Sequence, residues 1–355
     1  MKKFLKVVGI VLASLVAVVL LFVAVASIAE YRPADVETVA LAGNADGVLE
    51  SGQTLTIVSW NLGYGGLSET ADFFMDGGTG VHTQDRAQVN TNLQAFIDRI
   101  AEENPDVIYL QEVDVGSTRS WYINEAEQIG NAYPNYQNGF ANNFKVLYMP
   151  FPMPPYGHID SGIMTLSRFA ASEATRVQLP CPFSWPVRTL NLKRCLLVER
   201  IPIVGSDKEL VLINLHLEAY DSGEGKVAQT KMLVDLMQAE REKGNYVIAG
   251  GDFNQSFSSV DTSMYPLQGE GLWECGEIDT TAFPSNWQFC MDTTYPTCRS
   301  LDRPLVRSDE TFQYYVIDGF IVSDNLIVES METFNEGFAN TDHNPIKIVI
   351  TLIPE

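Results

Sequence analysis

The sequence predicts an N-terminal transmembrane helix followed by one α/β domain. The helix is predicted by an uncharged, apolar segment at residues 7–29. The α/β class is predicted by short runs rich in β-branched residues, which alternate with segments whose apolar residues recur every three and four positions. Residues 54–355 are long for one domain but within the range of a single layered α/β fold, and no internal repeat divides them.

The apolar segment begins after Met1-Lys2-Lys3 and Lys6 and runs for 23 residues (29 − 7 + 1). A bilayer-spanning helix needs about 20 apolar residues, whereas the core of a secretory signal is only about 7–15 residues long. The length therefore favours a retained anchor for residues 1–29, although Ala24-Val25-Ala26 fits a cleavage site and leaves a signal peptide as the alternative. Lysines before the segment predict a single-pass protein of the cell membrane whose domain is extracytoplasmic.

Residues 30–53 are rich in Ala, Asp, Glu and Gly and show no period, which indicates a spacer between the membrane and a domain at residues 54–355. The chain carries 45 acidic and 23 basic residues, a formal charge of −22. Such a surface repels polyanions, so the charge disfavours nucleic acid as a partner. We expect a monomer.

Five cysteines lie in a compartment where disulfides persist. Their odd number leaves at least one unpaired. Cys290 and Cys298 flank a Tyr295-Pro296 turn and are the first pair to consider, but the connectivity does not follow from the sequence.

The predicted strands and helices follow in order along the chain. Strands are expected at residues 54–60, 107–110, 162–166, 210–215, 246–250, 315–317 and 346–352. Apolar residues at helical spacing predict helices around residues 89–100 and 226–243, ended by Asn104-Pro105 and Gly244-Asn245. Residues 141–186 are dense in Pro, Phe and Met, and 162–166 is the one strand predicted there; residues 275–307 are expected to be a loop.

Five of these strands end at a polar side chain that suits phosphoester hydrolysis. This reaction needs a metal ion, a group that activates water, and donors near the leaving oxygen. The candidates, in chain order, are Asn61, Gln111-Glu112, His216, Gly250-Gly251-Asp252-Phe253-Asn254, Asp318 and Thr341-Asp342-His343. Taken singly, each has an ordinary explanation as a turn or core residue, whereas the ordered set favours a site.

This ordered set resembles the endonuclease/exonuclease/phosphatase superfamily, which has the deoxyribonuclease I-like fold. The resemblance covers residues 54–352 and implies a four-layer sandwich of two packed mixed β-sheets flanked by helices.

The resemblance also implies a role for each site residue. Glu112 would be the principal carboxylate on Mg²⁺ or Mn²⁺, with Asn61 beside it and Asp342 on the metal side; hard oxygen ligands suit these ions. Asp252 would orient or deprotonate the attacking water, and Asn254 would donate to a phosphoryl oxygen. His216 would donate to the phosphate or protonate the leaving oxygen, and His343 would bind the phosphate with its ring held by Asp318. The motif Ser167-Arg168 resembles a segment of the family in which a basic side chain approaches the phosphate. An arginine in a solvated loop explains the motif equally well.

The predicted function is that of a membrane-tethered, metal-dependent phosphoesterase. Its substrate is expected to be a small or lipid-linked phosphodiester or phosphomonoester, because an anchored enzyme meets lipid head groups at high local concentration. A surface nuclease acting on extracellular DNA or RNA is the first alternative. A surface binding module without catalysis is the second.

Overall fold

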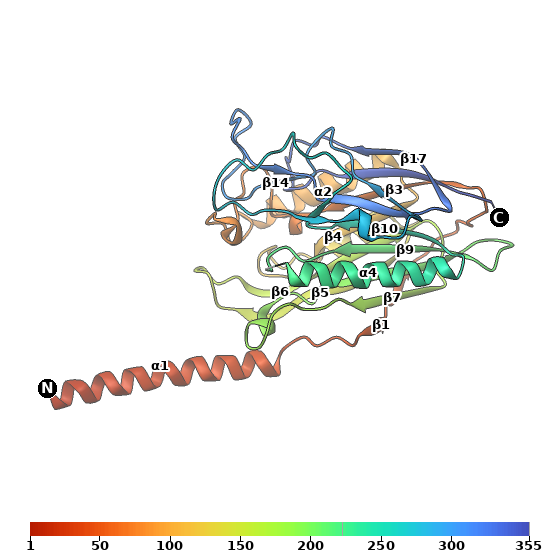
Figure 1. Ribbon diagram of the computed structural model, residues 1–355. Helices are drawn as coiled ribbons and strands as arrows, with labels where there is room; N and C mark the ends of the chain where they lie inside the picture. The colour runs from red at the N-terminus through yellow and green to blue at the C-terminus, as the bar shows by residue number, and fades with distance from the viewer. Residues whose placement is uncertain (222, 355) are drawn as a thin grey trace.

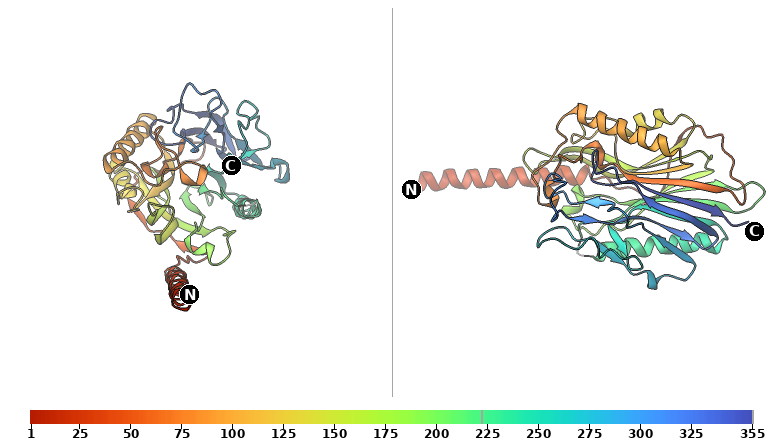
Figure 2. Two further views of the ribbon diagram at one scale, coloured as in Figure 1. Left: turned by 90° about the vertical axis from the view of Figure 1, so that its left-hand side faces the viewer. Right: turned by 90° about the horizontal axis from the view of Figure 1, so that it is seen from above.

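The computed structural model describes residues 1–221 and 223–354. Within these residues, two seven-stranded mixed sheets pack face to face, and helices cover their outer faces (Figures 1 and 2). The predicted four-layer α/β sandwich is therefore confirmed. A long N-terminal helix projects from one end of the domain.

Each sheet contains parallel and antiparallel pairs. The first has the order β17 (Leu326–Thr333), β18 (Ile346–Leu352), β3 (Thr54–Asn61), β4 (Val107–Asp114), β6 (Gly157–Ser167), β5 (Gln137–Met149) and β2 (Leu41–Gly43). The second has the order β1 (Val36–Thr38), β7 (Glu173–Gln178), β8 (Cys195–Pro202), β9 (Glu209–His216), β10 (Tyr246–Asp252), β16 (Asp318–Ser323) and β13 (Trp287–Cys290). Two short pairs lie outside them, β11 (Gln255–Phe257) with β12 (Gly276–Ile278) and β14 (Cys298–Arg299) with β15 (Tyr314–Tyr315).

Helices α2 (Arg86–Glu103) and α3 (Glu125–Ala132) cover the first sheet, and α4 (Glu224–Glu242) covers the second. Asp85 begins α2 by accepting a hydrogen bond from the Gln88 backbone N–H at 2.8 Å. The helix ends at Asn104, which takes the left-handed conformation before Pro105. Single turns of 3-10 helix occur at η1 (Gly63–Gly65), η2 (Phe74–Asp76), η3 (Val187–Leu190) and η4 (Thr280–Ala282).

The core between the sheets determines where the polar strand ends lie. In β3, Leu55 and Ile57 face the second sheet, and Asn61 continues the same alternation. Alternate residues also face the core between the sheets in β4 up to Gln111, in β9 up to His216 and in β10 up to Asp252. Because β3 and β4 are parallel, as are β9 and β10, these four polar side chains meet at one edge of the sandwich.

Several predicted boundaries were wrong. The segment 30–53, expected to be a spacer, supplies β1 and β2, which pair with β7 and β5 and extend one edge of each sheet. The segment 141–186 contains most of β5, all of β6 and all of β7, where only residues 162–166 were predicted as a strand. The expected loop at residues 275–307 contains β12, β13 and β14.

Asp318 also differs from the prediction, because it begins a strand instead of ending one. Residues 315–317 lie before β16, which runs antiparallel to β10 and pairs Asp318 with Asp252. The first residue of an antiparallel strand lies beside the last residue of its neighbour, so Asp318 still reaches the same edge.

All five cysteines are unpaired, so the Cys290–Cys298 disulfide was a wrong prediction. Cys290 ends β13 and packs against the core between the sheets, whereas Cys298 belongs to a separate cluster with Tyr315 and Ile317.

Helix α1 (Lys2–Ile28) is long and apolar enough to cross a membrane, with a mean hydropathy of 3.1. A signal sequence and a single-pass anchor both fit this helix.

Candidate active site

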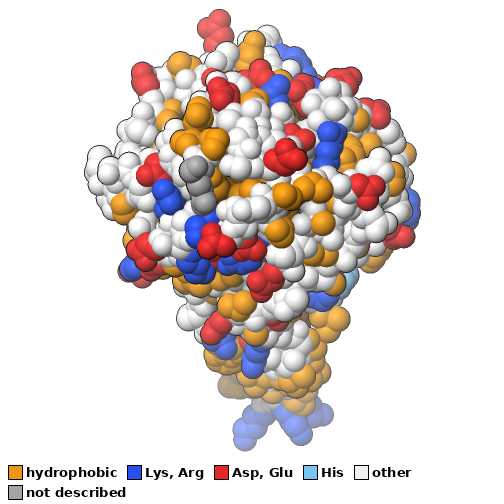
Figure 3. Space-filling model, turned by 90° about the vertical axis from the view of Figure 1, so that its right-hand side faces the viewer, with side chains coloured by type: hydrophobic (Ala, Val, Ile, Leu, Met, Phe, Trp, Pro, Cys, Tyr) orange, Lys and Arg blue, Asp and Glu red, His pale blue; other side chains and the backbone are white. Residues whose placement is uncertain are grey.

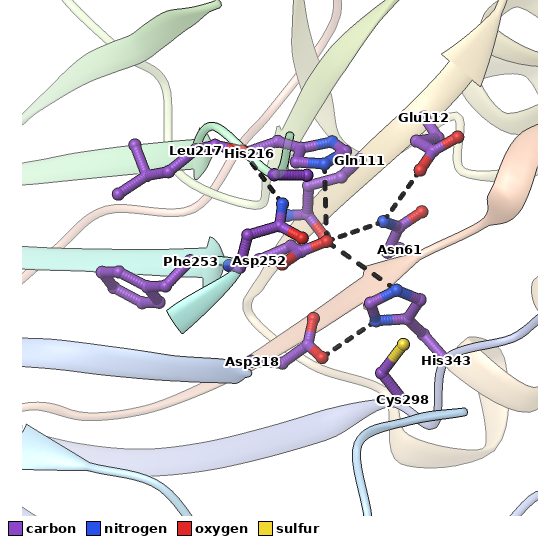
Figure 4. Close-up of polar contacts among 12 residues, drawn as sticks. Asn61, Gln111, Glu112, His216, Leu217, Asp252, Phe253, Cys298, Asp318 and His343 are labelled. Atoms are coloured by element: carbon purple, nitrogen blue, oxygen red, sulfur yellow. Dashed lines mark hydrogen bonds and ion pairs between the residues drawn. The ribbon is translucent and has the colours of Figure 1, made fainter. Parts of the chain in front are cut away.

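Asp252, at the end of β10, is the residue around which the polar strand ends gather (Figure 4). Its Oδ2 accepts a hydrogen bond from Asn61 Nδ2 at 3.0 Å, and its Oδ1 accepts one from the Asn254 backbone N–H at 2.8 Å. Nε2 of His216 lies 3.4 Å from Oδ2, and Nε2 of His343 lies 3.7 Å from it. One carboxylate is thus approached by side chains from three other segments.

His343 is held from behind by Asp318, as predicted. Its Nδ1 lies 2.9 Å from Asp318 Oδ2, and its backbone carbonyl accepts a hydrogen bond from the Trp60 indole at 2.9 Å. These contacts direct Nε2 toward Asp252 (Figure 4). A carboxylate behind an imidazole fixes the tautomer and raises the basicity of the ring.

Glu112 and Asp342, the two carboxylates expected to bind a metal ion, both line the cavity of the site. Asn61 Nδ2 donates to Glu112 Oε1 at 3.2 Å, and Thr341 Oγ1 bonds both Asp342 Oδ1 at 3.2 Å and the Asn61 carbonyl at 3.1 Å. Glu112 has φ of 52° and sits at a bulge between β4 and β6. A bulge redirects a side chain, and here it turns the carboxylate into the site.

A cavity of about 390 Å³ opens beside these groups. Its polar wall includes Glu112, His216, Asp252, Asn254, Asp342 and His343. Its other wall is largely apolar and includes Phe73, Phe74, Met149, Phe183, Leu190 and Leu192. Of the eight predicted residues, six line the cavity, while Asn61 and Asp318 support them from behind. The structure therefore brings the whole predicted set together.

The two histidines have pKa shifts of opposite sign. Burial lowers the pKa of His216 well below its usual value, and the nearby Arg194 lowers it further. Burial also disfavours the charged form of His343, but Asp318 outweighs it and raises the pKa of His343 well above its usual value. The surroundings of the two rings thus favour the neutral form of His216 and the charged form of His343.

The carboxylates are shifted upward. Burial and the neighbouring Asp318 raise the pKa of Asp252 to about 7. Burial raises the pKa of Glu112, and Asp342 adds to this while Arg119 opposes it. The anionic form of both carboxyl groups is thus disfavoured unless a nearby positive charge stabilises it.

Arg119 is a site residue that the sequence did not reveal. It donates to Asp114 Oδ1 and to the Tyr156 hydroxyl at 2.9 and 2.7 Å, and its guanidinium lies 3.8 Å from the centre of the Tyr64 ring. All of these partners except Asp114 line the cavity with it. Its only sequence signal is its position shortly after Gln111-Glu112.

Four other basic residues divide between the cavity and the surface. Arg194 lies on the cavity wall, with Nε 4.0 Å from Glu218 Oε2. Arg168 contacts Tyr136 and Asn104 at the opposite end of β6, so its predicted approach to the phosphate was wrong. Lys145 pairs with Asp160, and Arg188 pairs with Glu30.

A hydrogen bond across the two sheets lies beneath the site. Gln111 Nε2 on β4 donates to Asn214 Oδ1 on β9 at 2.8 Å. Asn214 in turn donates to the carbonyl oxygens of Leu110 and Met164 at 3.2 and 2.9 Å. Gln111 and Asn214 both occupy strand positions whose side chains point into the core between the sheets. A polar residue at such a position, one or two residues before a predicted site residue, is the sequence signal that identifies them.

The donor chemistry fits a hard divalent cation. Glu112 and Asp342 are carboxylates on one cavity wall, and the negative charge of Asp342 disfavours ionisation of Glu112. A cation between them would remove this repulsion, and oxygen donors suit Mg²⁺ or Mn²⁺. Two further groups have donor atoms within 4.8 Å of one another, Asp252–Asp318–His343 and Cys298–Asp342–His343.

Solved structures of other proteins share the fold of this chain. The chain is similar to an endonuclease/exonuclease/phosphatase protein from Beutenbergia cavernae (16% identity, TM-score 0.55, covering 85% of this chain and 72% of the other). A family protein from Bacteroides vulgatus is similar over 84% of this chain and 99% of its own (13% identity, TM-score 0.53). The human Nocturnin catalytic domain with bound sulfate is similar over 88% and 97%, respectively (14% identity, TM-score 0.50).

No curated protein matches the chain. The model of the endonuclease/exonuclease/phosphatase family matches residues 58–343, which contain every predicted site residue. This match covers most of the chain, and the fold and the buried carboxylate and histidine cluster agree with it. The chain therefore belongs to the endonuclease/exonuclease/phosphatase family and is a phosphoester hydrolase.

Proposed function

We propose that this protein is a membrane-tethered, extracytoplasmic phosphoesterase that requires Mg²⁺ or Mn²⁺ and hydrolyses a small or lipid-linked phosphoester. The observation that supports it best is the arrangement around Asp252. The Nε2 atoms of His216 and His343 stand 3.4 and 3.7 Å from its Oδ2, too far for good N–H···O hydrogen bonds. Both imidazoles therefore keep donor capacity for an incoming oxygen atom.

Asp252 is the group that positions and deprotonates the attacking water. Its pKa of about 7 suits a base that exchanges a proton near neutral pH. The water oxygen bonds to phosphorus while the bond from phosphorus to the leaving oxygen breaks. The leaving oxygen then needs a proton, and a doubly protonated His343 can supply it.

His216 and Asn254 bind the phosphoryl oxygens in this proposal. A neutral His216 donates one N–H, and its Nδ1 is a buried atom without a hydrogen-bond partner in the described part of the chain. Asn254 Nδ2 donates to the Leu217 carbonyl at 2.9 Å and retains a second N–H for substrate. Of the two roles predicted for His216, donation to the phosphate fits its lowered pKa better.

Glu112 and Asp342 would hold the cation, with Asn61 beside them. The cation supplies positive charge that offsets the charge on the phosphoryl group. Asn61 Nδ2 faces both Glu112 and Asp252, so this residue also fixes the distance between the metal side and the base.

The cavity favours a small head group over a nucleic acid strand. Three arginines line the cavity, and each already has protein partners. Arg119 faces Asp114 and Arg194 faces Glu218. Arg299 donates to the backbone carbonyls of Ser68 and Ser300. A polyanion gains little from arginines that are already paired, and the formal charge of −22 opposes its approach.

The test is a substrate panel with the full chain in detergent micelles. It contains bis-p-nitrophenyl phosphate, p-nitrophenyl phosphate, sphingomyelin and plasmid DNA, each with Mg²⁺, Mn²⁺ or EDTA. We expect metal-dependent turnover of at least one small or lipid phosphoester, lost in Glu112→Gln. Turnover of DNA alone would support a nuclease, and no turnover of any substrate would overturn the proposal.

A further inference from the structure

The described surface carries an apolar rim beside the cavity mouth. We define the apolar rim as the exposed side chains Leu147, Tyr148, Phe151, Met153, Trp185 and Val187. The first four belong to the end of β5 and the turn into β6, and the last two to the loop around η3. Met149, Phe183, Val187 and Leu190 from the same two segments line the cavity. The two segments that carry the rim therefore also supply part of the apolar wall of the cavity.

The rim lies at the edge of the sandwich that carries the site. β6 runs antiparallel to β4, so the turn between β5 and β6 lies at the end of β4 that carries Glu112. Helix α1 projects from this same end, away from the C-terminus (Figures 1 and 2). On the opposite end of the domain, charged side chains of both signs are interspersed with hydrophobic ones (Figure 3).

Direct contacts tie α1 to the η3 loop. The Trp185 indole N–H donates to Ser27 Oγ, in the last turn of α1, at 2.9 Å. Glu30, just after the helix, lies 3.2 Å from Arg188 Nε and 3.3 Å from Lys193 Nζ. Phe22, Val23 and Ala26 are partly buried, whereas most of the helix is exposed. The η3 part of the rim, with Trp185 and Val187, therefore lies level with the last turns of the apolar helix.

A bilayer that surrounds α1 must meet the rim. The hydrocarbon core occupies about 20 residues of a spanning helix, and the apolar segment of this chain is 23 residues long. Trp and Tyr favour the membrane interface, and a continuous exposed apolar patch marks a surface that binds a membrane or a partner.

We infer that the active site opens onto the bilayer crossed by its own anchor, and that the apolar rim inserts into the outer leaflet. The substrate is then a phospholipid of that leaflet, whose head group enters the cavity while its chains stay against the rim. This inference rests on the proposed phosphoesterase function and on retention of α1, and it narrows the substrate from any small phosphoester to a lipid.

The experiment uses the full chain reconstituted into vesicles of phosphatidylcholine, phosphatidylglycerol and sphingomyelin. Phe151→Ser/Met153→Ser removes two rim side chains that are 53% and 82% exposed and do not line the cavity. Val204→Ser/Ile327→Ser is the matched control, because these residues are 60% and 47% exposed at the opposite end of the domain. Head-group release and hydrolysis of bis-p-nitrophenyl phosphate are measured for each.

We expect the rim variant to lose at least about tenfold in head-group release, because two apolar side chains no longer partition into the leaflet. Its rate on bis-p-nitrophenyl phosphate and both rates of the control variant should stay at wild-type values. Equal losses in the two double variants, or turnover of the soluble ester without release from any vesicle lipid, would overturn the inference.

A second readout does not depend on activity. Brominated lipids quench the fluorescence of tryptophans that enter a bilayer. We therefore expect them to quench the fluorescence of the wild-type protein, and to quench that of Trp185→Phe less. Absence of this Trp185 component overturns the membrane-facing orientation. If neither substrate is hydrolysed, the proposed function fails, and the quenching still decides the orientation on its own.

Discussion

The surroundings of Asp252 act on the pKa of its carboxyl group in two opposite directions. It is buried and close to a second carboxylate, Asp318, and both effects raise its pKa to about 7. It also accepts hydrogen bonds from Asn61 and from the Asn254 backbone, which favour the anion. A carboxylate balanced in this way can gain and lose a proton within the working range of an enzyme.

Asp252→Asn tests the role of this carboxylate with almost no change in shape. We expect kcat on bis-p-nitrophenyl phosphate to fall by about 10²–10⁴-fold, the usual contribution of a positioned general base. The midpoint of thermal unfolding should not fall, because the substitution removes a buried carboxylate whose anion is disfavoured. A variant that keeps near wild-type kcat contradicts the assignment of Asp252 as the base.

Asp318→Asn tests the support behind His343. Asp318 stabilises the charged imidazole, so its replacement should lower the pKa of His343 and narrow the pH range in which the ring is doubly protonated. Titration of the ring nitrogens by NMR measures this directly, with the circular dichroism spectrum as the control for folding. An unchanged His343 titration would show that the 2.9 Å contact does not set its charge.

At the scale of elements, the buried strands could be predicted and the half-exposed ones could not. β3, β9 and β10 are rich in apolar and β-branched residues because both of their faces are covered. β5 contains Gln, Asn and Lys at exposed or partly buried positions, and β1 and β2 are three-residue strands whose formation depends on pairing with β7 and β5. Such pairing is a tertiary effect that a local pattern does not contain.

The same distinction applies to the site. Asn61, Glu112, His216 and Asp252 lie where apolar runs stop, so the strand pattern locates them. Asp342 and His343 lie in the loop before β18, so they were located by their motif. Arg119 lies in a turn, and its partners Tyr64, Asp114 and Tyr156 come from separate segments, so only the folded chain brings them together. The position of Asp318 followed from the motif, but its place at the start of β16 required the pairing with β10.

Strand β8 contains a buried carboxylate that links stability to pH. Glu199 is 1% exposed, its Oε1 lacks a hydrogen-bond partner within the described residues, and burial raises its pKa from 4.5 to about 8. The folded protein therefore retains a proton between these pH values that the unfolded chain has released. Stability must fall as pH rises through this window, and below about pH 4.5 the effect vanishes because both states are protonated.

Glu199→Gln should remove this dependence. At pH 7 we expect the variant to be more stable by up to about 3 kcal/mol, with the difference shrinking toward pH 4.5. Urea unfolding of both proteins across this range measures the difference, and Glu50→Gln, at an exposed position, is the control. A gain that does not vary with pH would mean that packing, and not the proton, is responsible.

At the scale of the whole molecule, the proposed cation site joins distant parts of the chain. Glu112 comes from β4 and Asp342 from the loop before β18, and both reach the cavity. A ligand that binds only the folded state stabilises it by about 2.7 kcal/mol at a concentration 100 times its Kd.

We therefore expect Mg²⁺ or Mn²⁺ to raise the midpoint of thermal unfolding and EDTA to reverse the effect. Glu112→Gln should abolish most of the rise, since a neutral amide no longer compensates the cation. NaCl at matched ionic strength is the control for screening. The same metal-induced rise in wild type and variant would place the cation elsewhere.

The hydrogen bond from Gln111 to Asn214 has a consequence for how activity arises during refolding. This bond joins the two sheets directly beneath the site, and Asp252 belongs to one sheet while Asn61 and Glu112 belong to the other. Neither half of the sandwich holds a complete set of reacting groups, so turnover should return only after the halves have docked. Recovery of activity after dilution from urea should consequently lag behind the return of secondary structure.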